Sequence, residues 1–145
     1  MIGLRTAYRV VADIVRTSSA ALVTTGLTSP IAAGQRQKFR AWIPFTVGAT
    51  GGVRLQVVVP AGGTLFDVSI KLYNTVAPSL TTAFQAASAA FTNAAANAGT
   101  HWLEVEGVIV NGVTAGNIDI QMGQNTSDVL SLTILQNGWM EVTTA

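Results

Sequence analysis

The chain has 145 residues, of which 49% are hydrophobic and 10% are charged, and its formal net charge is +1. Soluble domains carry about 25% charged residues, so part of this surface is expected to be buried against further copies or a larger assembly. The alternative is a surface rich in uncharged Thr, Asn, Gln and Ser. There is no cysteine, which excludes disulfides and thiolate metal sites.

The N-terminal segment does not resemble a signal peptide, because Arg5, Arg9, Asp13 and Arg16 interrupt it before an apolar core forms. No run approaches the ~18 apolar residues of a membrane span. The basic residues lack the interleaved aromatic residues of a nucleic-acid surface. We therefore expect a soluble product of the cytoplasm that has neither membrane nor nucleic acid as a partner.

Residues 1–16 are predicted to form an N-terminal arm, and residues 17–145 a single folded domain. Alternating apolar residues in the arm favour a strand, whereas a stripe of Leu4, Tyr8, Val11 and Val15 favours a short amphipathic helix, and both remain open. Such an arm often stays mobile until it meets a partner.

The next segments read as strands at 36–47, 53–59 and 66–73, separated by Gly-rich turns. Pro44 predicts that the first of them is an edge strand or is bulged near its end. In the third, Phe66, Val68, Ile70 and Leu72 are expected to share one face. The alanine-rich residues 83–98 fit either a helix or a strand.

The last third of the chain contains short alternating strands at 101–108, 118–122, 129–135 and 139–142. The turn dipeptides Asn111-Gly112 and Asn137-Gly138 separate them, because these residues tolerate positive φ. The strand at 129–135 is too apolar to face water on both sides. Strands and turns at this spacing predict an all-β, antiparallel β-sandwich.

Charge is divided along the chain: seven of the eight basic residues precede Leu55, and six of the seven acidic residues follow it. Arg36, Lys38 and Arg40 alternate on one face of a predicted strand, and Glu104 and Glu106 do so on another. We expect these two strands to lie side by side and form ion pairs. The alternative is that the basic N-terminal residues contact a neighbouring subunit or an acidic partner.

Candidate catalytic groups are few. His101 is the only histidine, so a His-rich metal site would need several copies around a symmetry axis, and a partly buried structural residue beside Trp102 is preferred. Glu104 and Glu106 lie about 7 Å apart along a strand, within the range of glycosidase carboxylates, but a solvated or ion-paired face is the favoured interpretation. We expect no enzyme activity, no metal and no cofactor.

Trp42, Trp102 and Trp139 are the candidate subunit-interface residues, because tryptophan often anchors cores and interfaces. If they were exposed together, they could instead stack against sugars.

Two stretches carry a resemblance to a known module: TSSAALVTTGLTSPIAAGQRQKFRAWIPF (17–45) and VEGVIVNGVTAGNIDIQMGQNTSDVLSLTILQNGWMEV (105–142). Together they resemble a jelly-roll module of tailed-bacteriophage virion proteins, found in capsid decoration proteins, head-surface proteins and tail-fibre tips. The resemblance implies a jelly-roll sandwich related to trimers of the tumour-necrosis-factor (TNF) type.

The function that this resemblance implies is that of a homotrimeric decoration (cement) protein on the outer surface of a phage head, bound between major capsid subunits. Five arm residues would contact the capsid or a neighbouring trimer: Leu4, Arg5, Tyr8, Arg9 and Arg16. A fibre or baseplate tip that recognises a host glycan and a head-to-tail connector are the alternatives.

Overall fold

The computed structural model describes residues 4–76, 79–85, 90–93 and 98–144, which form twelve β-strands. The strands are β1 (Arg5–Arg9), β2 (Ile14–Arg16), β3 (Val23–Ile31), β4 (Arg36–Val47), β5 (Val53–Val58), β6 (Thr64–Asn74), β7 (Ser79–Gln85), β8 (Phe91–Asn93), β9 (Gly99–Val110), β10 (Gly116–Gly123), β11 (Leu132–Ile134) and β12 (Trp139–Thr144). Among these residues there is no helix of the length and apolarity needed to cross a membrane.

The strand pairing defines a jelly roll. β3 pairs with β10, β4 with β9, β5 with β8 and β6 with β7, all antiparallel, so the pairs are nested like those of one long hairpin. Successive pairs lie in opposite sheets, which is how a rolled hairpin forms a double-sheet sandwich. The pairs β6·β9 and β10·β5 complete the two sheets. The predicted all-β, jelly-roll-type sandwich is therefore confirmed.

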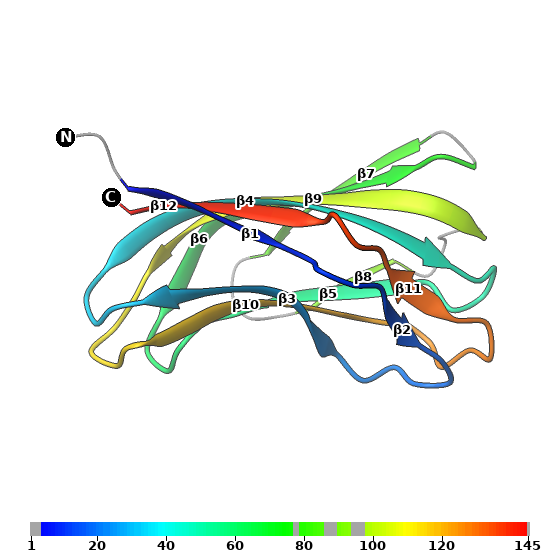
Figure 1. Cartoon of the computed structure of the whole chain (residues 1–145), viewed down its shortest axis with the longest axis horizontal. Helices are drawn as coiled ribbons and strands as arrows, with labels where there is room; N and C mark the ends of the chain where they lie inside the picture. Colours follow the sequence, from blue (N-terminus) through cyan, green and yellow to red (C-terminus); the bar gives the residue numbers. More distant parts are fainter. Residues whose placement is uncertain (1–3, 77–78, 86–89, 94–97, 145) are drawn as a thin grey trace.

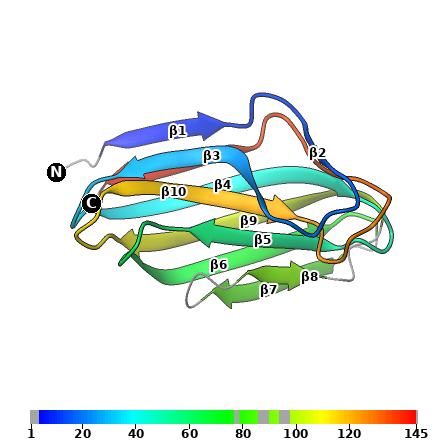
Figure 2. The same cartoon turned by 90° about the horizontal axis from the view of Figure 1, so that it is seen from below.

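The larger sheet, called sheet A, has the order β1-β12-β4-β9-β6-β7, with β11 paired to β4 and β2 paired to β11. The smaller one, sheet B, has the order β3-β10-β5-β8. Figure 1 shows the two sheets edge-on, with β1 running from sheet A across the opening of the sandwich towards β2. Figure 2 shows sheet B in front and β1 beside β3 at one side of the molecule.

Between the sheets lies one apolar core, to which nearly every long strand contributes alternate side chains. The largest fully buried members are Phe39, Phe45, Leu27, Ile31, Ile43, Leu55, Ile70, Leu103, Ile109, Ile118, Ile120 and Met122. Because side chains alternate along a strand with a period of two, each buried residue places its neighbours in that strand on the outer face of the sheet. The core therefore dictates which side chains reach the surface of each sheet.

The predicted pairing of the basic strand at 36–47 with the acidic strand at 101–108 is confirmed. β4 and β9 are neighbours over their whole length, and the basic stripe of β4 lies beside the acidic stripe of β9, with Arg40 opposite Glu106. Gly107 of β9 faces the core, where an added Cβ would lie 2.8 Å from Val68 and 3.1 Å from Phe39. A side chain at this position would displace Phe39, which explains the glycine.

Strand β6 departs from the predicted alternation. Its pairing with β9 shifts between Phe66 and Ser69, and Asp67 has a φ of 50°, as expected for a β-bulge. The bulge reverses the side-chain order, so Leu65 is buried and Phe66 is 48% exposed. The prediction that Phe66 shares a face with Val68 is therefore wrong.

Of the two alternatives predicted at Pro44, the edge strand is wrong, but the pairing is irregular there: the three residue steps from Phe45 to Trp42 lie opposite the five steps from Ile134 to Trp139. β4 lies inside sheet A, with β9 on one side and β11 and β12 on the other. Pro44 is tolerated there because it lies opposite the gap between β11, which ends at Ile134, and β12, which begins at Trp139. A missing N–H group in that gap removes no bond from the ladder.

The apolar stretch at 129–135 forms a strand only at its centre. β11 contains three residues, and Val129 and Leu130 lie outside it, 79% and 53% exposed. The prediction of a strand over the full stretch is therefore wrong. In the alanine-rich segment, residues 83–85 belong to β7 and 91–93 to β8, residues 90 and 98 lie outside the strands, and 86–89 and 94–97 lie outside the described residues.

Because of the bulge in β6, substitutions at the adjacent residues Leu65 and Phe66 should lower the free energy of unfolding by different amounts. Leu65→Ala should lower the free energy of unfolding by about 2–5 kcal/mol, because it removes a buried side chain. Phe66→Ala should cost less than about 1 kcal/mol, because the ring lies on the outer face. Urea denaturation of both variants measures the difference, and a larger cost for Phe66→Ala would mean that β6 alternates without a bulge.

Candidate functional site

The three candidate interface tryptophans lie together on the outer face of sheet A. Trp42 is the register partner of Trp139 in β12, and its ring centroid lies 6.0 Å from that of Trp102 in β9. Tyr73 of β6 extends the group, with its ring centroid 5.6 Å from Trp42. We call Trp42, Tyr73, Trp102 and Trp139 the aromatic patch. All four are partly exposed.

The sheet geometry explains why these residues meet. They occupy outward-facing positions on β12, β4, β9 and β6, and these strands are hydrogen-bonded neighbours in that order. Leu80 of β7 is the register partner of Tyr73 and is 54% exposed, so it lengthens the patch across a fifth strand. The result is an apolar stripe that crosses the sheet rather than following one strand.

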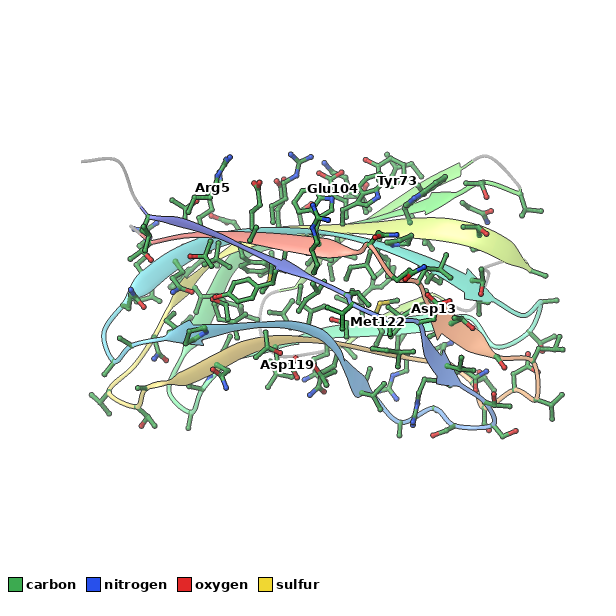
Figure 3. All side chains as sticks on the ribbon, viewed as in Figure 1. Arg5, Asp13, Tyr73, Glu104, Asp119 and Met122 are labelled. Atoms are coloured by element: carbon green, nitrogen blue, oxygen red, sulfur yellow. The ribbon has the colours of Figure 1, made fainter. Side chains whose placement is uncertain are left out.

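An ion pair with a buried carboxylate lies beside this stripe. Glu104 is 7% exposed, although it lies on the outer face, because the patch rings and Arg40 cover it. Arg40 donates from Nε and Nη2 to Glu104 Oε1, at 3.2 and 2.7 Å. The Tyr73 hydroxyl donates to Oε2 at 3.0 Å. Both carboxylate oxygens are thus engaged, and Figure 3 shows Glu104 and Tyr73 on the same outer surface.

These contacts set the pKa of Glu104. Burial raises the pKa of this carboxyl group, but the hydrogen bonds from Arg40 and Tyr73 and the positive charge of Arg40 lower it further than burial raises it. The pKa of Glu104 therefore lies below the ordinary glutamate value. The bond to Glu104 raises the pKa of Tyr73, so the phenol stays protonated and keeps donating.

Sequence reasoning expected the basic half and the acidic half of the chain to pair within one subunit, and two ion pairs agree. Besides Arg40 with Glu104, the Nη2 atom of Arg5 lies 3.5 Å from Glu141 Oε2. The Arg5 pair is exposed on both sides and adds little stability. Glu104 is engaged with Arg40 and Tyr73, which favours the ion-paired interpretation over a catalytic pair with Glu106.

His101 lies in the core. It is fully buried, faces away from Trp102 across β9, and its ring centroid is 5.6 Å from that of Phe45. Its Nδ1 accepts a hydrogen bond from the Thr75 backbone N–H at 3.3 Å. The expectation of a partly buried histidine is therefore corrected to a fully buried one. Within the described residues, no group of three or more acidic, histidine or cysteine side chains could hold a metal.

The arm residues lie on their own subunit. β1 pairs with β12 and β2 with β11, so the strand interpretation holds for these two segments and the helical stripe does not form. Between them Val10 is 3% exposed and belongs to the core. The remaining arm residues differ in exposure: Leu4, Arg5 and Arg9 are exposed, and Tyr8 and Arg16 are partly buried.

Two features of the site were missed from the sequence. Tyr73 was placed in a predicted strand, but no sequence signal connected it to the tryptophans of other strands. Leu80 lies in a segment without a clear pattern. Tyr73 could have been found from the sequence, because Ser69, Lys71 and Tyr73 are alternate residues on the outward face of β6.

No protein-family model matches the chain, and no curated protein matches it significantly. Among solved structures it is similar to the Eiger TNF of S. frugiperda, with a TM-score of 0.46 and 6% identity, over 100% of this chain and 94% of that one. It is also similar to the CBM22-1–GH10 modules of xylanase 10B from Clostridium thermocellum, with a TM-score of 0.38 and 12% identity, over 95% of this chain and 28% of that one.

A third similar structure is the tripod from the baseplate of bacteriophage Tuc2009, with a TM-score of 0.35 and 9% identity, over 95% of this chain and 64% of that one. The chain thus spans less than two-thirds of the xylanase and baseplate chains. All three TM-scores lie below 0.5, so the jelly-roll assignment of this protein rests on its strand pairing. The phage-virion part of the resemblance stays a prediction.

The Glu104 contacts predict a pH dependence of stability. Because the folded pKa of Glu104 lies below its unfolded value of about 4.3, its stabilisation is complete above that pH and is lost as the pH falls through the folded pKa. Unfolding free energy should therefore fall more steeply in the wild type than in Glu104→Gln as the solution is acidified. Tyr73→Phe, which loses one hydrogen bond, should lie between them. Parallel curves for the wild type and Glu104→Gln would contradict the assignment.

Proposed function

We propose that this protein is a structural component of a phage virion: a homotrimeric decoration protein that binds the outside of the head between major capsid subunits. The observation that carries the proposal is the aromatic patch, a continuous apolar stripe on an otherwise regular sheet face. Its basis in sequence is the resemblance over residues 17–45 and 105–142. The proposal assigns the chain no catalytic step.

The outer face of sheet A has the composition of a subunit interface. Tryptophan and tyrosine are enriched at interface centres, where they bury much area with little loss of side-chain entropy. Here the rings surround a satisfied ion pair, so contact with another subunit would leave neither Arg40 nor Glu104 without a partner. Lys38 and Glu141 lie farther along the same face and provide opposite charges at the rim.

The low charged fraction has a natural explanation in this arrangement. A monomer would expose the stripe to water, whereas a ring of three copies buries it against a neighbour at each interface. Sheet B forms the opposite face of the molecule. On its outer side, Asp119 Oδ1 accepts hydrogen bonds from the hydroxyl groups of Thr24, at 2.5 Å, and Thr28, at 2.9 Å. In the described strands of sheet B the one aromatic residue, Phe91, is buried, so sheet A with its outward-facing rings is the better candidate for self-association.

The basic residues of the arm are the proposed contact with the capsid. Arg5 and Arg9 project from β1 at the edge of sheet A, beside β12. A trimer would present three such edges, and weak contacts made simultaneously would bind by avidity. The arm is paired with its own subunit, so it would act as a fixed basic edge rather than as a free strand.

A second candidate is recognition of a host glycan by a fibre or baseplate tip. The tilted rings of Trp42, Tyr73 and Trp102 next to a carboxylate are a surface on which sugar rings can stack. The two functions make opposite demands on the patch, because it is buried in a trimer interface and exposed in a glycan site. Tryptophan fluorescence quenching by acrylamide in the native oligomer separates them.

The trimer is tested by native mass spectrometry. The wild type should give three times the chain mass, and the double variant Trp42→Ala with Trp102→Ala should give monomers that retain the wild-type far-ultraviolet spectrum. Val113→Ala, at a turn residue that is 95% exposed, is the control and should stay trimeric. A folded double variant that remains a trimer would overturn the assignment of this face.

The capsid contact is tested without deleting the arm, because removing residues 1–16 would also remove Val10 from the core. Arg5→Ser with Arg9→Ser should weaken cosedimentation with undecorated capsids by at least about tenfold, since the loss is repeated in three subunits. Arg36→Ser removes one exposed charge from β4, away from both the arm and the interface rim, and is the control for Arg9→Ser alone. Equal losses in these two single variants would mean that only net charge matters.

A further inference from the structure

Strand β7 forms one edge of sheet A and is open to solvent on both of its faces. It is the last strand in the order of the sheet, and Figure 2 shows it on the side of the molecule opposite β1. Leu80, Thr81 and Thr82 are all exposed, although successive residues of a strand point to opposite faces. Among the described residues, β7 pairs only with β6.

The other edge strands carry features that prevent pairing with a further strand. Proteins protect sheet edges with short strands, charged residues, proline and bulges, because an unprotected edge is a template for another strand. β2 and β8 contain three residues each, and β1 contains Arg5 and Arg9. β3 contains Pro30, and its pairing with β10 shifts register beyond Asp119.

β7 has none of these protective features. It contains seven residues, SLTTAFQ, without a charged residue or a proline. Its register with β6 is continuous from Ser79, opposite Asn74, to Gln85, opposite Val68. Of the edge strands in the described part of the chain, β7 is therefore the one suited to pairing with another strand.

The sequence of β7 is complementary to a second copy of itself. In an antiparallel pair centred on Thr82, this residue lies opposite Thr82 of the second copy, and Leu80 lies opposite Phe84 of the second copy. Directly opposed threonines stabilise a sheet, and the Leu–Phe pairs would bury apolar area. No like charges would meet, because the strand carries no charge. Such a contact is isologous and closes at two copies.

We propose that β7 pairs antiparallel with β7 of a second copy about a two-fold axis at Thr82, so that the two A sheets form one continuous sheet. The axis is perpendicular to the sheet, so the outer faces of both copies lie on the same side. Because Leu80 lengthens the aromatic patch, the pair would also join the two apolar stripes.

This contact is small, since a single strand pair buries less area than a standard interface. It would therefore form at high protein concentration, or between copies already held side by side on a common surface. Linking one trimer to the next in this way rests on the proposed function, whereas the strand pair itself does not.

Disulfide trapping tests the register, because the chain contains no cysteine. Directly opposed residues of an antiparallel pair have Cα atoms about 4.5–5.5 Å apart, a separation that a disulfide spans. Thr82→Cys should therefore form a covalent dimer when the concentrated full-length protein is mildly oxidised, as read on a non-reducing denaturing gel. This band does not require a trimer, so its absence is distinguishable from failure of the trimer.

Leu80→Cys is the matched control, since Leu80 is exposed on the same strand. In the proposed register the two copies of this residue are offset by about 13 Å along the strands, so they should not be linked. A Thr82→Cys variant that stays unlinked, or a Leu80→Cys variant that is linked equally well, would overturn the proposal.

Opposite charges at the axis provide a second test. Thr82→Glu and Thr82→Lys each place like charges opposite one another, whereas a mixture of the two variants places opposite charges there. Sedimentation velocity at high concentration should show that each variant alone loses the doubled species and that the mixture recovers it. Thr114→Lys, at an exposed turn residue, should associate like the wild type. A mixture of folded variants without recovery would contradict the two-fold pairing.

Discussion

The fold depends on the twelve-residue ladder between β4 and β9, which runs from Arg36 opposite Val110 to Val47 opposite Gly99. It lies inside sheet A, with β12 and β11 on one side and β6 on the other. Because side chains alternate along both strands, the ladder separates two environments with one register. Its inner side provides Phe39, Ile43 and Leu103 to the core, and its outer side carries the ion pair and two of the patch tryptophans. A shift by one residue would exchange these two sides.

This constraint explains why the residues of the aromatic patch form one continuous stripe. The patch residues come from four strands that are far apart in sequence, and the sheet alone brings them together. Arg40 and Tyr73 neutralise and satisfy Glu104 within the subunit, so the carboxylate is prepared for burial. Both oxygens of the carboxylate are already engaged, as the proposed subunit interface would require. The β1 edge lies to one side and leaves the patch free.

Much of the fold could be predicted from the sequence, because its long strands alternate clearly. The β4 strand, the inward and outward faces of β9, and the pairing of their basic and acidic stripes followed from local pattern and charge. The jelly-roll topology came from a resemblance, since strand order is not encoded in any local period. The failures have local causes: a bulge at Asp67 reversed Phe66, and an interruption between β11 and β12 accommodated Pro44 inside a sheet. The tryptophans were identified as a group, but the positions of Tyr73 and Leu80 beside them depend on pairing between strands that no single segment reveals.

The proposed role on a phage head is tested most directly by the copy number of the protein per mature virion, measured by quantitative mass spectrometry against the major capsid protein. A decoration trimer predicts an abundance comparable with that of the major capsid protein. An abundance of only a few copies would contradict the account and place the protein at the tail or neck, where host recognition or joining would become its function.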